Sequence, residues 1–431
     1  MYKRSLIITA ILLLAVINTN SQEYNGFSIS GRHLYDRCGE KVILRGVANP
    51  NIWFEKNGNP RYAEIKQTNA NVVRIVWTTQ GTALQLDQAI INCIGQQMIP
   101  MVELHDATGD WSKLQLCIDY WVRSDVLAVL QKHEDYLLIN IANECGDASV
   151  SNTTFRTGYE AAVEAMRASG IHVPLVIDGT DWGKNANILQ AEGPYLINAD
   201  PDHNLLFSVH MWWPQMYGFT ESDIADEIAQ SVEMDLPLMV GEFSQMHGAC
   251  DEDQITATNS IAYKTIIREC QEHEVGYIAW SWFGNCNPFW DMSSNGTYNT
   301  LYDWGLEVAV TDENSIKNTS IRPYSIVNGT CNITSTKEPE SGFSGSFILN
   351  GNYPNPFRST TSISYRLSKN SQVKLAVYNY TGEEVLALVN EHQIAGDYTK
   401  AFDAKGLAEG VYFYSIKADK YCESRKMVLI K

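Results

Sequence analysis

Eight short apolar runs, rich in β-branched residues, recur between Gly26 and Pro323 at intervals of roughly 30 to 40 residues. These runs are Val42–Val47, Val72–Val76, Met101–Leu104, Leu137–Ile141, Leu175–Ile177, Leu205–Val209, Leu238–Val240 and Tyr277–Trp280. Helix-like amphipathic segments separate several of them: Ala83–Gln97, Tyr120–Lys132, Tyr159–Ser169 and Ile261–His273. The alternation predicts an α/β fold in which eight βα units close a (β/α)8 TIM barrel over residues 24–323. A doubly wound sheet is the competing fold, but the glycine-rich first turn usual there is missing.

Polar residues cluster where the predicted strands end, and a TIM barrel carries its active site at the carboxyl ends of its strands. These residues are Arg74, His105, Asn143, Glu144, His210 and Glu242. The fourth and seventh strands lie on opposite sides of the barrel mouth, so Glu144 and Glu242 are expected to face each other across a substrate. Two facing carboxylates can cleave a glycosidic bond, one as proton donor and the other as nucleophile. Other carboxylates near the mouth, with expected hydrogen-bonding roles, are Glu103, Asp106, Asp178 and Asp181.

Seven motifs occur in order along the barrel region. They are Leu44-Arg45-Gly46-Val47, Val73-Arg74-Ile75-Val76, Glu103-Leu104-His105-Asp106-Ala107-Thr108-Gly109, Ile141-Ala142-Asn143-Glu144, Phe207-Ser208-Val209-His210-Met211, Gly241-Glu242-Phe243 and Ala279-Trp280-Ser281-Trp282. The series resembles glycoside hydrolase family 5, nearest to its bacterial β-mannanase branch. The resemblance implies a retaining endo-β-1,4-glycanase, with mannan favoured over glucan as the substrate.

The resemblance also implies roles for single residues. Glu144 would be the general acid/base and Glu242 the nucleophile, with their carboxyl groups about 5 Å apart. Arg74 would bond to the nucleophile and keep its pKa low, and Asn143 would bind the 2-hydroxyl of the sugar. Further expected substrate contacts are His105, His210, Trp280, Trp212 and Trp282. No metal or organic cofactor is implied, because two carboxylates and water suffice.

Three positions depart from the family pattern. Cys145 follows the acid/base where many relatives have proline, and Trp212 stands where relatives usually have a tyrosine that touches the nucleophile. Asn49-Pro50-Asn51 replaces a proline flanked by histidines in the mannanases. The last two departures leave glucan, xyloglucan and mixed-linkage glucan open as substrates. A barrel that only binds glycan also stays open, whereas a purely structural surface protein would leave the strand-end cluster unexplained.

The chain changes character after the barrel region. Residues 324–348 are rich in Ser, Thr, Gly and Asn and predict a linker. Strand-like runs separated by turn signals then predict an all-β sandwich over residues 349–431. The runs are Thr361–Leu367, Val373–Tyr378, Tyr398–Phe402, Val411–Ala418 and Lys426–Ile430.

Three segments of this tail carry a second resemblance: Asn352-Tyr353-Pro354-Asn355-Pro356-Phe357, Gly410-Val411-Tyr412-Phe413-Tyr414 and Lys426-Met427-Val428-Leu429-Ile430-Lys431. They look like the C-terminal sorting domain of the type IX secretion system of Bacteroidetes-like bacteria. The resemblance implies export across the outer membrane, to the medium or the cell surface. A carbohydrate-binding sandwich is the alternative.

The amino terminus predicts a secretory signal peptide over residues 1–22, because Lys3 and Arg4 precede the apolar run Leu6–Ile17. No later apolar run reaches membrane length, so no transmembrane segment is expected in the mature chain. The net charge of −18 argues against nucleic acid as a partner. Nine cysteines permit disulfides whose pairing the sequence leaves open, and the acidic segment Asp251–Asp253 is interpreted as solvated rather than as a calcium site.

Overall fold

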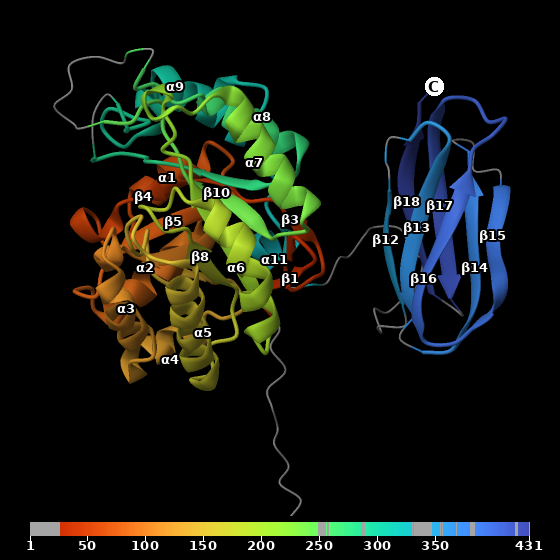
Figure 1. Ribbon diagram of the computed structural model, residues 1–431, viewed down its shortest axis with the longest axis horizontal. Helices are drawn as coiled ribbons and strands as arrows, with labels where there is room; N and C mark the ends of the chain where they lie inside the picture. The colour runs from red at the N-terminus through yellow and green to blue at the C-terminus, as the bar shows by residue number, and fades with distance from the viewer. Residues whose placement is uncertain are drawn as a thin grey trace, which may run out of the picture. The chain divides into compact units, whose positions relative to one another are not determined.

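The computed structural model describes residues 26–248, 256, 258–285, 289–329, 331, 347–353, 355, 357–367, 369–379, 384–418 and 421–430. The chain divides into two compact units, Met1–Ile333 and Thr334–Lys431 (Figure 1). The predicted signal peptide, the acidic segment at 251–253 and most of the predicted linker lie outside the described residues. Within the described part of the chain, none of the helices combines the length and the apolar character needed to cross a bilayer.

Eight parallel strands close a barrel in the first unit, in the order β10-β11-β4-β5-β6-β7-β8-β9. The strands are β4 (Arg45–Asn49), β5 (Val72–Trp77), β6 (Ile99–Leu104), β7 (Leu138–Asn140), β8 (Leu175–Asp178), β9 (Leu205–His210), β10 (Leu238–Glu242) and β11 (Gly276–Ala279). Every residue of these strands is buried, as expected for a parallel sheet covered on both faces. The predicted α/β barrel is confirmed.

Helices pack around the outside of the barrel (Figure 1). They are α1 (Arg61–Lys66), α2 (Ala83–Gly95), α3 (Leu114–Trp121), α4 (Ser124–Lys132), α5 (Asn152–Ala168), α6 (Ala186–Ala199), α7 (Glu221–Glu233), α8 (Tyr263–Glu272), α9 (Asp303–Leu306), α10 (Ile316–Thr319) and α11 (Tyr324–Asn328). Polar N-caps begin several of them: the side chains of Thr82 and Thr220 each form a capping box. The single helix predicted over Tyr120–Lys132 is instead the end of α3 followed by α4, because Arg123 between them has an extended backbone.

A small antiparallel sheet precedes the barrel, formed by β1 (Ser28–Ser30), β2 (His33–Tyr35) and β3 (Lys41–Val42). The first apolar run was predicted to be a single strand, but Val42 belongs to this sheet and the barrel strand begins at Arg45. The run is therefore divided between two sheets.

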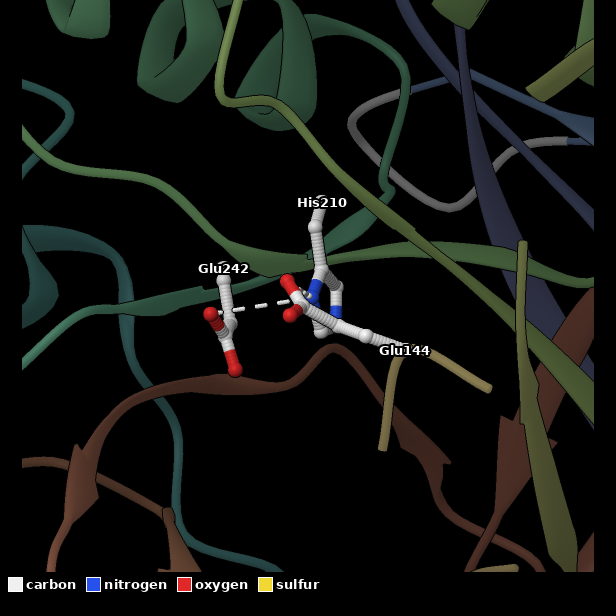
Figure 2. Close-up of side chains that lie close together, drawn as sticks. All are labelled: Glu144, His210 and Glu242. Carbon is white, nitrogen blue, oxygen red and sulfur yellow. Dashed lines mark hydrogen bonds and ion pairs between the residues drawn. The ribbon is translucent and has the colours of Figure 1, made fainter. Parts of the chain in front are cut away.

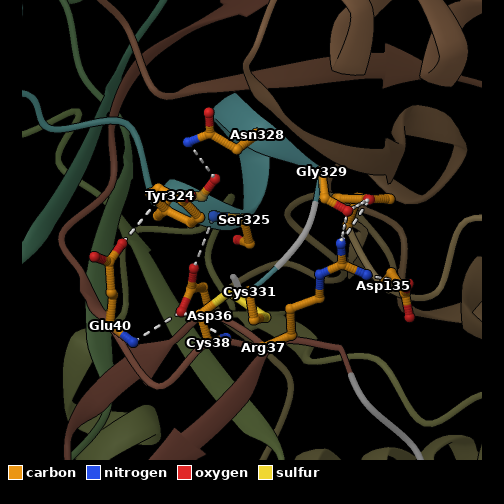
Figure 3. The surroundings of a disulfide bond; sticks show 11 residues. Asp36, Arg37, Cys38, Glu40, Asp135, Tyr324, Ser325, Asn328, Gly329 and Cys331 are labelled. Atoms are coloured by element: carbon orange, nitrogen blue, oxygen red, sulfur yellow. Dashed lines mark hydrogen bonds and ion pairs between the residues drawn. A yellow bond between two sulfur atoms is a disulfide. The ribbon is translucent and has the colours of Figure 1, made fainter. Parts of the chain in front are cut away.

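The barrel unit continues past the predicted boundary at residue 323. Helix α11 follows it, and a disulfide joins Cys38 of the β2–β3 turn to Cys331 (Figure 3). The backbone N–H of Tyr324 donates to Glu40 at 2.8 Å, and Arg37 donates to the carbonyl of Gly329 (Figure 3). The predicted linker start at 324 is wrong because these contacts hold residues 324–329 and Cys331 to the N-terminal sheet.

The second unit contains strands alone among its described elements, in a three-stranded sheet (β12-β13-β16) and a four-stranded sheet (β15-β14-β17-β18). The strands are β12 (Phe347–Tyr353), β13 (Thr360–Leu367), β14 (Ser371–Tyr378), β15 (Glu384–Gln393), β16 (Gly396–Asp403), β17 (Gly410–Ala418) and β18 (Tyr421–Leu429). Inward-facing apolar residues such as Leu375, Tyr414 and Met427 form one core. The predicted all-β domain is confirmed, with β12 and β15 as strands that the sequence did not predict.

Candidate active site

A cavity of about 540 Å³ opens at the carboxyl ends of the barrel strands. It is lined by Trp53, His105, Thr108, Glu144, Trp182, Lys184, Trp212, Tyr217, Glu242, His247, Gly248, Trp280, Asn285 and Trp290. Five of the predicted site residues are in this set. Arg74, Asn143 and His210 are buried directly beneath it, where they contact the two carboxylates or each other.

Glu242 ends strand β10 next to an irregularity in its pairing with β9. The preceding Gly241 leaves no room for a side chain, because a Cβ there would lie 2.1 Å from Ser208 Oγ. Its carboxylate accepts a hydrogen bond from Arg74 Nη1 at 2.7 Å and one from the indole N–H of Trp212 at 3.2 Å. Two donors therefore hold Glu242 in one orientation while it stays open to the cavity.

Glu144 follows strand β7 in a left-handed backbone conformation, with φ of 46°. A non-glycine residue adopts this conformation only where its surroundings impose it. Here the backbone N–H of Glu144 donates to Asp178 Oδ2 at 3.0 Å, and its Oε1 is 2.8 Å from His210 Nδ1 (Figure 2). One carboxylate oxygen each of Glu144 and Glu242 lies within 4.8 Å of the other.

Arg74 connects the residues beneath the cavity. Besides Glu242, its guanidinium donates to Asn140 at 2.7 Å and to Asn143 at 2.5 Å. The carboxylates of Glu103 and Asp178 lie 3.8 Å and 3.7 Å away. An arginine with 1 % exposure needs such anionic and polar partners, because an unpaired buried charge is costly.

The site electrostatics differ from the sequence expectation for the nucleophile. Burial raises the pKa of Glu242 to about 7, and the Glu144 carboxylate adds to this, while His210 and Arg74 lower the pKa without offsetting burial. Burial alone would lower the pKa of His210, but the carboxylates of Glu242 and Asp178 raise it to about 10. The prediction that Arg74 keeps the pKa of Glu242 low is wrong, because the net pKa is raised. Arg74 does lower this pKa, as expected, but burial outweighs its effect.

Glu144, His210 and Glu242 form a set of groups that are close enough to share a metal ion, since their ligand atoms lie within 4.8 Å of one another (Figure 2). An imidazole binds a metal only through an unprotonated nitrogen. His210 keeps both ring protons at neutral pH because its pKa is about 10, and its Nδ1 already pairs with Glu144. These three residues are therefore poorly suited to hold a cation, and the absence of a metal cofactor remains a prediction.

Aromatic rings form much of the cavity surface. Trp280 lies parallel to the imidazole of His105, with ring centroids 5.7 Å apart, and Trp53 meets the same imidazole edge-on at 5.1 Å. Trp212 packs against Trp290 at 5.5 Å on another part of the wall. Such faces offer flat apolar surfaces on which a sugar ring can stack.

Trp282 does not contribute to this surface. It is fully buried, and its indole N–H donates to the carbonyl of Gly296 at 2.9 Å. The prediction that Trp282 contacts substrate is wrong, because strand β11 ends at Ala279 and the chain then turns. Sequence reasoning also missed Asn140, which nothing in the local pattern distinguishes, and exposed Trp53, which follows the Asn49-Pro50-Asn51 departure.

A closed βα barrel with two buried carboxylates facing a common cavity, and aromatic rings around them, defines a glycoside hydrolase. Comparison with known families agrees, since residues 35–285 match the model of the cellulase family, glycosyl hydrolase family 5. The chain belongs to glycoside hydrolase family 5. Residues 352–431 match the secretion system C-terminal sorting domain.

The chain is also similar to individual mannan endo-1,4-beta-mannosidases. The chain is 31 % identical to a mannan endo-1,4-beta-mannosidase of Cellvibrio japonicus, over 72 % of this chain and 70 % of the relative. It is 29 % identical to a mannan endo-1,4-beta-mannosidase of Salipaludibacillus agaradhaerens, over 77 % and 99 %. Among solved structures, β-mannanase from Thermomonospora fusca matches with a TM-score of 0.62 and 30 % identity, covering 69 % of this chain and 98 % of that one.

Proposed function

We propose that this glycoside hydrolase is an endo-β-1,4-mannanase that retains the anomeric configuration. The observation that carries the mechanism is the approach of the Glu144 and Glu242 carboxylates to within 4.8 Å. Retaining enzymes keep their carboxyl groups about 5 Å apart, whereas inverting enzymes leave room for a water between them. The mannan-degrading relatives support the choice of polysaccharide.

In the first step, an oxygen of Glu242 attacks the anomeric carbon of a sugar in the cavity. The bond from that carbon to the glycosidic oxygen breaks, and Glu144 gives its proton to the departing oxygen. A glycosyl–enzyme ester on Glu242 results. In the second step, Glu144 takes a proton from water, the water oxygen replaces Glu242 on the anomeric carbon, and both carboxyl groups return to their starting states.

The surroundings of each carboxylate support this division of roles. Glu242 accepts two N–H hydrogen bonds, which favour its ionised form. Two nearby carboxylates repel each other, so the site favours one shared proton. Asn143, held by Arg74, is expected to bind the 2-hydroxyl, and Trp280 is expected to support the sugar ring from below.

The test is reducing-end release by the chain lacking residues 1–22 on galactomannan, glucomannan, carboxymethyl-cellulose and xyloglucan. Activity on both mannans, with the first product in the β configuration by NMR, is the expected result. Glu144→Gln and Glu242→Gln should each abolish turnover. Any activity that azide restores should yield a different product in each of the two variants. An α product would exclude retention, and binding without any turnover would make the barrel a glycan-binding protein.

A glucan substrate is the second candidate, and the departure at Asn49 and Asn51 favours it. Both side chains are buried, at 1 % and 0 % exposure, and neither lines the cavity. They therefore cannot supply polar contacts of the kind that cavity-lining histidines would make. Turnover of carboxymethyl-cellulose alone in the same panel would select an endo-β-1,4-glucanase.

The sorting domain at residues 352–431 supports a proposal about location. We infer that the signal peptide directs the chain to the periplasm, and that type IX secretion machinery then moves it to the cell surface or the medium. Deleting residues 352–431 in a host with this system should leave active enzyme inside the cell, measured by activity in the fractions. Unchanged activity outside the cell would contradict export through this domain.

A further inference from the structure

Asp178 ends strand β8 beneath the catalytic cavity, and neither step of the proposed reaction uses it. Its side chain is fully buried and does not line the cavity, so a substrate there cannot contact it. The Asp178 carboxylate accepts hydrogen bonds from the backbone N–H of Glu144 at 3.0 Å and from Asn140 Nδ2 at 3.1 Å. Its Oδ2 also lies 3.6 Å from His210 Nε2 and 3.7 Å from Arg74 Nη2. Asp178 thus contacts Glu144 and two charged residues of the site.

Asp178 is ionised in these surroundings. Burial alone would raise its pKa, but His210, Arg74 and the backbone N–H of Glu144 together lower the pKa below its ordinary value. An ionised carboxylate only accepts hydrogen bonds. A buried charge also stays with its partners, because separation from them would leave it uncompensated. Asp178 can therefore serve as a fixed acceptor beneath the cavity.

The backbone of Glu144 needs such an acceptor. Its left-handed conformation, with φ of 46°, persists only where the surroundings impose it. A proline at position 145 would restrict the preceding residue through its ring, whereas Cys145 does not. Hydrogen bonds hold the conformation instead, since the N–H of Glu144 donates to Asp178 and its carbonyl accepts from the N–H of Gly109 at 2.9 Å. The placement of the Glu144 side chain therefore depends on Asp178.

His210 provides a second connection between Asp178 and Glu144. The imidazole Nδ1 lies 2.8 Å from Glu144 Oε1, and Figure 2 shows this contact beside Glu242. The other ring nitrogen, Nε2, lies 3.6 Å from Asp178 Oδ2. Asp178 therefore acts on the backbone of Glu144 directly and on its carboxyl group through the imidazole.

We infer that Asp178 is a positioning residue that holds Glu144 where it can protonate the departing glycosidic oxygen. This inference rests on the proposed function, because it takes Glu144 as the acid/base. It predicts that a change at Asp178 impairs cleavage where the leaving group needs a proton and spares cleavage where the leaving group departs as a stable anion. A carboxylate that served only folding would affect both reactions alike.

The test variant is Asp178→Asn, which keeps the size of the side chain. In one orientation the new NH2 group faces the N–H of Glu144, and in the other it faces Asn140 Nδ2, so one of the two hydrogen bonds is lost either way. The assay is kcat/KM on phenyl and 2,4-dinitrophenyl β-mannobiosides, corrected for the folded fraction by circular dichroism. Phenolate is a poor leaving group without a proton, whereas dinitrophenolate departs without one. The matching β-cellobiosides serve if the enzyme cleaves only glucan.

Asp178→Asn should lower kcat/KM on the phenyl glycoside by about 100-fold, the cost of misplacing a catalytic group by about 1 Å. On the dinitrophenyl glycoside it should stay within about threefold of wild type, because that step needs no general acid. The matched control is Asp200→Asn. Asp200 is also fully buried, and it accepts hydrogen bonds from Arg167 and from the backbone N–H of Asn204, away from the cavity. This control should lose stability but keep the wild-type ratio of the two kcat/KM values.

Glu144→Gln sets the reference for loss of the proton donor. If Glu144→Gln loses the phenyl glycoside selectively while Asp178→Asn loses neither substrate, or loses both equally, the positioning role is refuted. An equal loss on both substrates by Glu144→Gln would instead refute Glu144 as the acid/base, and with it the proposed mechanism. If Asp178→Asn does not fold, Asn140→Ala supplies the test, because it removes the 3.1 Å hydrogen bond to Asp178 Oδ1. A smaller but selective loss on the phenyl glycoside would support the role, and equal effects on both substrates would refute it.

Discussion

Replacing Arg74 by methionine should separate the electrostatic role of this residue from its role in folding. Methionine keeps much of the side-chain length but removes the charge and the hydrogen bonds to Glu242, Asn140 and Asn143. Removing one partner of a buried charge cluster costs roughly 3–5 kcal/mol, because the remaining charge stays buried and uncompensated. If this loss raises the reaction barrier, kcat/KM falls by about two to four orders of magnitude.

The variant should also change the pH dependence. Arg74 lowers the pKa of Glu242, which is about 7 in the native site. Without the guanidinium this pKa rises further, so less Glu242 is ionised at neutral pH and the activity profile moves to higher pH. The assay is kcat/KM on galactomannan from pH 4 to 10, corrected for the folded fraction by circular dichroism.

Arg167→Met is the matched control. Arg167 is also buried and donates to Asp200 at 2.8 and 2.9 Å, away from the cavity. It should lose a similar amount of stability to denaturant but keep the activity of each folded molecule. The reasoning about Arg74 would be refuted if Arg74→Met kept kcat/KM within tenfold of wild type with an unchanged pH profile. It would also be refuted if both variants lost activity equally for each folded molecule.

Three further predictions follow from the site and the fold. Wild-type kcat/KM should rise as the pH increases through about 7, because Glu242 attacks only when ionised and its pKa is about 7; a profile already flat from pH 5 would contradict this. Trp212→Phe should lower kcat by roughly tenfold by removing the 3.2 Å hydrogen bond to Glu242, about 1–1.5 kcal/mol, and an unchanged kcat would show that this bond has no role. Replacing Cys38 and Cys331 by serine should reduce the free energy of unfolding by roughly 2–5 kcal/mol, because the bond closes a loop with a sequence separation of 293; denaturation in guanidinium without reductant measures this, and an unchanged midpoint would count against it.

Sequence analysis identified the strands whose burial produces a local pattern of apolar residues. All barrel strands are buried on both faces, so they appear as continuous apolar runs. Strand β15 (Glu384–Gln393) was missed because most of its residues are exposed, so it shows no continuous apolar run. The break between α3 and α4 was missed for a related reason. No helix-breaking residue marks it in the sequence, and Arg123 instead contacts Tyr120 and Asp125.

The sequence by itself determined the barrel, the sandwich and the positions of Glu144 and Glu242, because buried strands and strand-end polar residues are local patterns. Only the tertiary structure decided that Trp280 reaches the cavity while Trp282 is buried, since the chain turns directly after β11. It also decided the net pKa of Glu242, which is a balance between burial and charges from four different strands or their loops. A balance of this kind depends on distances across the barrel, and those distances exist only after the chain has folded.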